Sequence, residues 1–157
     1  HHRPFNDMGY AGVRIMEAHE NYNRQHQDIR IEDGINYGDV LEGVNFKYAK
    51  KLTAVNAINL ASIAWAPPAV KSLSIGGVVE PSVKFRWVAV DNNTVKGYKI
   101  YWRDTTSPIW QNSRYIGNVS EYTLDGIVID NFLFGISTVG KNGIESPVVF
   151  PNKVFRD

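Results

Sequence analysis

The sequence predicts two parts of different fold class, an α/β piece with a long helix followed by an all-β sandwich. Apolar residues recur with a helical period over residues 45–65. The segment Ala66-Pro67-Pro68-Ala69 then ends any helix. From residue 83 onward, apolar and polar residues alternate with a period of two, as in half-buried strands. We therefore expect a first part over residues 1–66, a linker at 67–69 and a second domain over residues 70–157.

The first part is expected to contain a short strand, a polar loop and a long helix. The apolar run from Ala11 to Met16 predicts the strand, and the polar residues 20–28 follow it. Asn45 is a suitable N-cap for the helix, and Pro67 ends it. On this helix Tyr48, Leu52, Val55 and Ile63 fall within roughly a quarter of the circumference. Such an apolar face needs a sheet or other helices to cover it.

The second part is expected to be an antiparallel β-sandwich. Its alternating segments place these apolar residues on one face: Val83, Phe85, Trp87, Tyr98, Ile100, Trp102, Phe132, Phe134 and Ile136. Turn-forming residues lie between the segments at 91–93, 105–108, 125–126 and 141–143. This spacing and the size of the segment are typical of a sandwich.

Composition excludes several classes of function. The chain has 157 residues, 43% of them hydrophobic, which is enough for one domain or two small ones. A net charge of +1 gives no case for nucleic acid, and no apolar run is long enough for a membrane span. The absence of Cys excludes disulfides and thiolate metal sites. The sequence also lacks a phosphate-binding loop, a Gly-x-Ser-x-Gly elbow and a His-Glu-x-x-His motif.

Three segments of the first part resemble the C-terminal third of the M28 family of zinc aminopeptidases. The segments are His2-Arg3-Pro4-Phe5, Gly9-Tyr10-Ala11-Gly12-Val13-Arg14-Ile15-Met16-Glu17 and Glu20-Asn21-Tyr22-Asn23-Arg24-Gln25-His26-Gln27-Asp28. The resemblance covers residues 1–66 and implies a C-terminal piece of an α/β zinc-exopeptidase domain. In the family, the histidine that aligns with His26 is the last metal ligand in the chain.

The resemblance implies a zinc-dependent aminopeptidase that removes N-terminal residues from peptides with a metal-activated water. Two zinc ions are implied, with His26 as a ligand of one. The other ligands and the glutamate general base would precede residue 1, so we expect this chain to be a fragment that is inactive by itself. The resemblance also implies a bacterial parent exported to the periplasm or the medium, with a peptide as substrate.

Other residues near His26 are candidates for supporting roles. Tyr22 is a candidate for lining the substrate pocket, and Glu17 for a supporting hydrogen bond at the end of the strand. Asp28 could accept a hydrogen bond from the His26 ring, although a loop cap is the commoner role of such a residue. His2 matches the histidine of the family's Ser-Asp-His motif, where His1 replaces the aspartate. His19 lies in the same region but outside the family pattern.

The second part is similar to a fibronectin type III domain. The similarity rests on Trp87, on Gly97-Tyr98-Lys99-Ile100-Tyr101-Trp102 and on the segment from Phe132 to Ser146. Phe132 stands at the tyrosine-corner position, so the hydroxyl of that corner is lost. Three aromatic residues, Tyr101, Trp110 and Tyr115, leave open a contact with a glycan or a protein, although scattered surface aromatics are common. Two glycosylation sequons begin at Asn92 and Asn118, which would have no use in a bacterium.

Two other functions remain open. One is a glutaminyl-cyclase-like acyltransferase, which shares the fold and uses one zinc ion, although the long polar loop and the added sandwich disfavour it. The other is a binding or spacer module without catalysis, in which the sandwich docks onto substrate or cell wall.

Overall fold

The computed structural model describes residues 2–10, 12–77 and 81–155. His1 and Ala11, which entered the sequence predictions, lie outside these ranges. The chain forms two compact units, His1–Ile58 and Asn59–Asp157. The boundary between these units lies inside the long helix. The predicted division into domains, with a linker at residues 67–69, stays a prediction. Each unit is described by itself.

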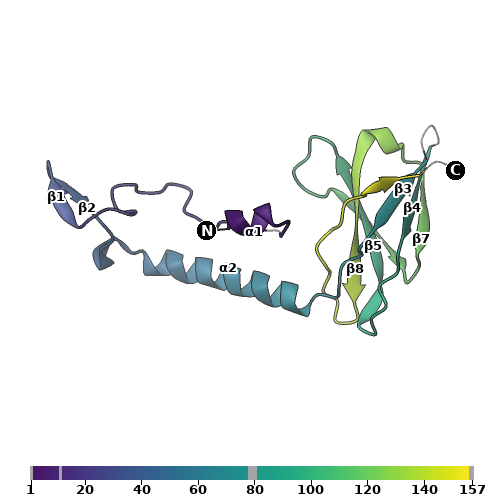
Figure 1. The fold of residues 1–157 in the computed structure, drawn as a ribbon, viewed down its shortest axis with the longest axis horizontal. Helices are drawn as coiled ribbons and strands as arrows, with labels where there is room; N and C mark the ends of the chain where they lie inside the picture. The colour runs from purple at the N-terminus through teal and green to yellow at the C-terminus, as the bar shows by residue number, and fades with distance from the viewer. Residues whose placement is uncertain (1, 11, 78–80, 156–157) are drawn as a thin grey trace. The chain divides into compact units, whose positions relative to one another are not determined.

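The first unit consists of short elements joined by loops (Figure 1). Helix α1 spans Arg3–Asp7, and strands β1 (Arg30–Glu32) and β2 (Ile35–Tyr37) form an antiparallel hairpin. Both residues of its turn have positive φ, 50° at Asp33 and 77° at Gly34, which is the backbone of a two-residue hairpin turn. The Asp-Gly pair is a signal for this turn in the sequence. A 3₁₀ turn, η1 (Leu41–Gly43), follows the hairpin.

Helix α2 spans Phe46–Trp65, as the sequence predicts. The Asn45 side chain caps it by accepting a hydrogen bond from the Tyr48 N–H, with 3.1 Å between Oδ1 and N. No residue of α2 is buried; Tyr48 and Leu52 of the predicted apolar face are half-buried, while Val55 and Ile63 are exposed. The apolar face is therefore left largely uncovered by the described residues. None of the helices described is long and apolar enough to cross a bilayer.

The strand predicted over residues 11–16 is wrong for the part that the structure describes. Residues 12–16 form no strand, and Val13 is 81% exposed. A strand is held by hydrogen bonds to a neighbouring strand, and no described segment pairs with residues 12–16. An apolar run alone does not supply that partner, so the α/β sheet implied by the resemblance is not seen in these residues.

The second unit is a β-sandwich of two sheets (Figure 1). The first sheet has the order β7-β4-β3-β9, with β3 at Leu73–Gly76, β4 at Ser82–Trp87, β7 at Glu121–Asp125 and β9 at Lys153–Val154. The second has the order β6-β5-β8, with β5 at Val95–Asp104, β6 at Asn112–Gly117 and β8 at Phe132–Gly140, which follows the 3₁₀ turn η2 (Ile129–Asn131). Residues 145–149 run beside β8 through two isolated bridges. This arrangement of strands is that of a fibronectin-like sandwich.

Among the residues that the structure describes, the hydrophobic core lies in the second unit. Its buried residues are Val70, Leu73, Ile75, Val83, Phe85, Trp87, Val95, Tyr98, Ile100, Leu124, Phe134 and Ile136. Trp87 packs edge-on against Tyr98, with 5.2 Å between ring centroids, and Phe85 packs in the same way against Phe134 at 5.6 Å. The alternation read from the sequence therefore identified the inward faces of β4, β5 and β8 correctly.

Phe132, at the tyrosine-corner position, has no hydroxyl, but the hydroxyl of Tyr98 bonds the core to a loop. Phe132 begins β8 half-buried and packs near Phe134, with 6.3 Å between ring centroids. The fully buried Tyr98 hydroxyl accepts a hydrogen bond from the Val90 N–H at 2.7 Å. This bond fixes the loop between β4 and β5 to the middle of the sandwich.

Candidate metal-binding loop around His26

The segment that leads to His26 is held by an ion pair. Nη2 of Arg14 lies 3.0 Å from Oε1 of Glu20, whose side chain is only 13% exposed. The Gln25 carboxamide joins this pair in the orientation that satisfies both neighbours: its nitrogen donates to Glu20 at 3.1 Å, and its oxygen accepts from Arg14 at 3.3 Å. Glu20 is largely shielded from solvent while Arg14 is about half exposed, so the contacts of Gln25 with both partners add to what a single surface ion pair would contribute.

A backbone contact holds the same loop from its other side. The Gly38 N–H donates to the Asn23 carbonyl at 2.9 Å, which ties the loop to the chain leaving the β1–β2 hairpin. Gly38 has φ 94°, and a Cβ at this position would lie 2.8 Å from the Ile29 Cα. Glycine is therefore required for this close approach.

His26 lies on this loop with an exposed side chain. Its backbone has φ 53°, a left-handed conformation that is uncommon for a residue with a side chain. Such conformations persist only where the surrounding structure imposes them, and they are found often at functional sites. The loop thus presents the imidazole of His26 outward from a restrained backbone.

A cavity of about 390 Å³ lies beside the loop and is lined by carboxylates as well as by Arg24. Glu17 contributes to it, together with Glu20 and Asp39. The sequence analysis singled out Glu17 but not the other two. Glu20 also forms the ion pair with Arg14, six residues away, a contact that is visible only in three dimensions.

The remaining predicted site residues do not converge on His26. Tyr22 is 70% exposed, Asp28 is exposed and His2 is half-buried near Gly12. The hydrogen bond found at Asp28 comes from the Arg30 side chain to its carbonyl at 3.5 Å, not from the His26 ring. Their roles in a metal site stay predictions.

A zinc site needs more donors than the described loop brings together. Structural zinc takes four protein ligands, and catalytic zinc takes three with a water. Over residues 2–10, 12–77 and 81–155, no group of three or more His, Asp or Glu side chains is placed to hold a metal ion. The described residues thus do not fit zinc by themselves. A site that includes His26 needs donors from outside them.

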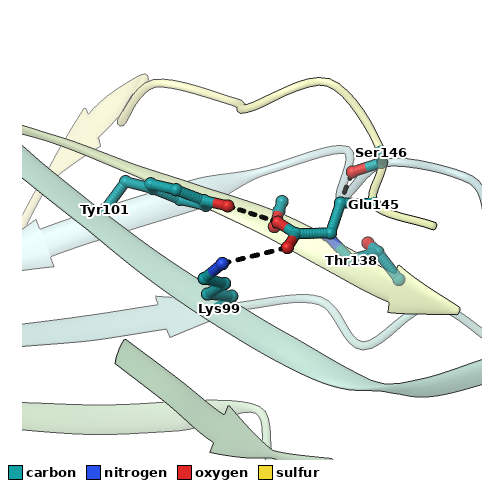
Figure 2. Close-up of polar contacts among 6 residues, drawn as sticks. Lys99, Tyr101, Thr138, Glu145 and Ser146 are labelled. Atoms are coloured by element: carbon teal, nitrogen blue, oxygen red, sulfur yellow. Dashed lines mark hydrogen bonds and ion pairs between the residues drawn. The ribbon is translucent and has the colours of Figure 1, made fainter. Parts of the chain in front are cut away.

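The sandwich carries a polar cluster of its own on the outer face of β5 and β8 (Figure 2). The Glu145 carboxylate accepts hydrogen bonds from Lys99 at 3.0 Å, from Ser137 at 2.7 Å and from the Tyr101 hydroxyl. Burial would raise the pKa of Glu145, but these three bonds and the positive charge of Lys99 outweigh it and lower that pKa below its ordinary value. The pKa of Lys99 is raised, and the largest cause is its hydrogen bond to Glu145. The cluster joins the segment after β8 to the middle of the sheet.

The sequence is similar over almost its whole length to fungal proteins named probable zinc metalloprotease. The relative from Leptosphaeria maculans is 37% identical over 151 residues, covering 96% of this chain and 35% of that protein. The relative from Pyrenophora tritici-repentis is 37% identical over 153 residues, with the same coverage of both chains. A relative from Pyricularia oryzae is 35% identical over 156 residues, covering 96% of this chain and 31% of that protein. The chain therefore spans about a third of the length of these relatives.

No family model matches the sequence. Among solved structures, the fibronectin type III domain of human collagen α1(XX) has a TM-score of 0.42 and 12% identity, covering 59% of this chain and 91% of that one. Titin module A71 from human cardiac muscle has a TM-score of 0.37 and 18% identity, covering 53% of this chain and 84% of that one. The assignment of the sandwich rests on its own strand order. Zinc metalloprotease is the name that the sequence relatives carry.

Proposed function

We propose that this chain is the C-terminal part of a zinc-dependent aminopeptidase of the M28 type, and that His26 is one of its metal ligands. The observation that carries the proposal is the restrained loop from which the His26 imidazole points outward. The names of the relatives support zinc and proteolysis, and the motifs around Gly9 and Tyr22 support the aminopeptidase class.

The geometry of the loop suits a ligand to a metal held mainly by other segments. The bond between Arg14 and Glu20 and the bond from Gly38 to Asn23 limit the movement of the backbone that carries His26. A ligand that is already positioned binds with a smaller loss of conformational entropy. An exposed imidazole can approach donors from a neighbouring part of a larger protein.

The exposed apolar face of helix α2 favours the proposal that this chain is part of a larger domain. Phe46, Ile58 and Leu60 are each at least 60% exposed, and together with Val55 and Ile63 they leave much apolar surface in water. A 20-residue helix in a folded protein is stabilised mainly by packing of its apolar face. About two thirds of the length of the relatives has no counterpart in this chain, which leaves ample sequence for a covering sheet.

Further parts of the proposal concern substrate, metal and compartment. A peptide with a free N-terminus is the proposed substrate, and two zinc ions are the proposed metals. We also propose export from the cell. The expectation of a bacterial source gains no support from relatives that come from fungi.

The test uses the protein at its full encoded length. A leucyl anilide reports aminopeptidase activity, whereas a peptide with N-terminal glutamine reports cyclisation by a glutaminyl-cyclase-like enzyme. We expect chelator-sensitive release of the anilide and no cyclisation. Cyclisation without anilide hydrolysis would support the acyltransferase instead. If neither reaction is observed, the non-catalytic binding or spacer module would be favoured.

One observation favours a second candidate function, a binding module for glycans. On the outer face of the sandwich, Trp110 lies 5.9 Å from Tyr101 and 5.3 Å from Phe150 between ring centroids, with the Arg103 guanidinium 5.3 Å from its ring. Flat aromatic groups beside a cation suit stacking on a sugar ring. Tyr115 contacts Lys96 instead: the Lys96 ammonium lies 5.8 Å from the Tyr115 ring centroid, and the Tyr115 hydroxyl donates to the Lys96 carbonyl. Retention on cell-wall glycan that is lost in Trp110→Ala but kept in Tyr115→Ala would support this function.

A further inference from the structure

Two glycosylation sequons occupy surface loops at one end of the sandwich. Asn92-Asn93-Thr94 lies in the loop between β4 and β5, and Asn118-Val119-Ser120 forms the turn between β6 and β7. The two loops lie at the same end because Tyr98, near the start of β5, pairs with Gly117 at the end of β6. The Trp87 N–H, at the end of β4, donates to the Ser120 carbonyl at 3.0 Å.

The Asn118 sequon is open to solvent. Asn118, Val119 and Ser120 are all exposed, and the turn follows Gly117, which has φ 77°. The hydrogen bond that anchors the turn uses the carbonyl of Ser120 and leaves its hydroxyl out. A sugar on the Asn118 side chain therefore displaces no core contact of the sandwich.

The Asn92 side chain is half-buried and is held through its oxygen, not its nitrogen. Oδ1 of Asn92 accepts hydrogen bonds from the Thr94 N–H at 2.8 Å and from the Thr94 hydroxyl at 2.6 Å. Both bonds use the oxygen of the carboxamide. The glycan is attached to the nitrogen, so the turn is retained when the sugar is present.

We propose that Asn118 and Asn92 are acceptors of N-linked glycans when this chain passes through a eukaryotic secretory pathway. In the transfer, Nδ2 of the asparagine forms a bond to C1 of the first N-acetylglucosamine of a lipid-linked oligosaccharide. The bond from C1 to the lipid pyrophosphate breaks, the pyrophosphate leaves, and Nδ2 loses one proton. The inference rests on export, which is part of the proposed function, but not on zinc or on peptidase chemistry.

The relatives and the surface chemistry of this end both support glycans here. Sequons have no use in a bacterium, but the three relatives reported above come from fungi, which glycosylate exported proteins. Val88 and Val119, next to the bonded pair of Trp87 and Ser120, are 67% and 39% exposed. Glycans at this end would shield these apolar side chains from solvent.

The test is expression of the 157-residue chain behind a secretion signal in yeast, with intact-mass measurement before and after enzymatic removal of N-glycans. We expect two glycans on the secreted chain and none on the same chain made in the bacterial cytoplasm. Asn118→Asp and Asn92→Asp should each remove one glycan. Asp keeps the side-chain oxygen that holds the turn at position 92, so the fold is retained.

Two controls separate glycosylation at these asparagines from other modification. Ser120→Ala keeps Asn118 but destroys its sequon, and it should also remove one glycan. Asn112→Gln changes an exposed asparagine outside any sequon and should leave the mass increment unchanged. A secreted chain of unmodified mass would overturn the proposal. If Asn118→Asp or Asn92→Asp leaves the added mass unchanged, the substituted asparagine does not carry a glycan. Because the readout is mass, failure here leaves the proposed peptidase untouched.

Discussion

Lys99 and Glu145 are joined by a 3.0 Å ion pair that connects the middle of β5 to the segment after β8. Both side chains are less than a third exposed, so solvent screens the pair less than it screens a surface pair. Tyr101 and Ser137 donate to the same carboxylate, which leaves Glu145 with three donors. The segment that completes the sheet beside β8 is therefore held by charge as well as by backbone bonds.

Stability of the sandwich should depend on pH through Glu145. The lowered pKa means that the ionised form is favoured in the folded state. The ionised Glu145 carboxylate contributes to the free energy of unfolding above its unfolded-state pKa, near 4.5. This contribution is lost as pH falls through the lower folded-state pKa. We expect a loss of about 1 kcal/mol, because the group is partly exposed. Urea unfolding at a series of acidic pH values measures it.

The control for this prediction is Glu145→Gln, which keeps the shape of the side chain and removes its titration. This variant should be less stable at neutral pH, and its unfolding free energy should fall less between neutral and acidic pH. An equal fall in both proteins would show that another group causes the acid dependence.

Trp87→Ala should destabilise the sandwich by about 3–5 kcal/mol, since it leaves a cavity in a packed core. Trp87 is 6% exposed and contacts Tyr98, whereas Trp65 in α2 is 68% exposed. Trp65→Ala removes the same side chain and should change the free energy of unfolding by less than about 0.5 kcal/mol. Thermal unfolding followed by circular dichroism compares the two. Similar losses in both variants would contradict the described core.

Residues 69–157 should fold by themselves as an all-β domain. The core cluster lies within this segment, from Val70 to Ile136, and so does the buried Val139. The far-ultraviolet circular dichroism spectrum of the isolated segment should show β-structure and a cooperative thermal transition. A disordered or helical spectrum would mean that the first unit is needed for folding.

The 157-residue chain should have no aminopeptidase activity with added zinc. One imidazole can neither hold a catalytic ion nor act as the general base, and the described residues bring no further ligands to His26. Hydrolysis of leucyl anilide by the purified chain, abolished by a chelator, would show that the active site is complete within it.

The sequence predicted those elements whose signals are local. The cap at Asn45 and the prolines after Ala66 defined α2 to within a residue, and alternation identified β4, β5 and β8. Residues 12–16 have the composition of a strand but no partner among the described residues, and pairing is a property of tertiary structure. The contact of Arg14 with Glu20 and Gln25 was invisible to the sequence analysis for the same reason. The motif match named His26 as a candidate ligand, which stays a prediction, and its left-handed conformation is seen only in the structure.

We propose that His26 binds metal, and His19 offers a matched control. Both side chains are exposed imidazoles in the same region, but of the two only His26 has the left-handed backbone and matches a metal ligand of the proposed family. The measurement is zinc content by mass spectrometry, together with the rate on leucyl anilide, for His26→Ala and His19→Ala in the protein at its full encoded length. We predict that His26→Ala loses metal and most of its activity, by about 10-fold or more, while His19→Ala keeps both. Equal losses in the two variants, or full metal occupancy and a near-normal rate in His26→Ala, would contradict the account.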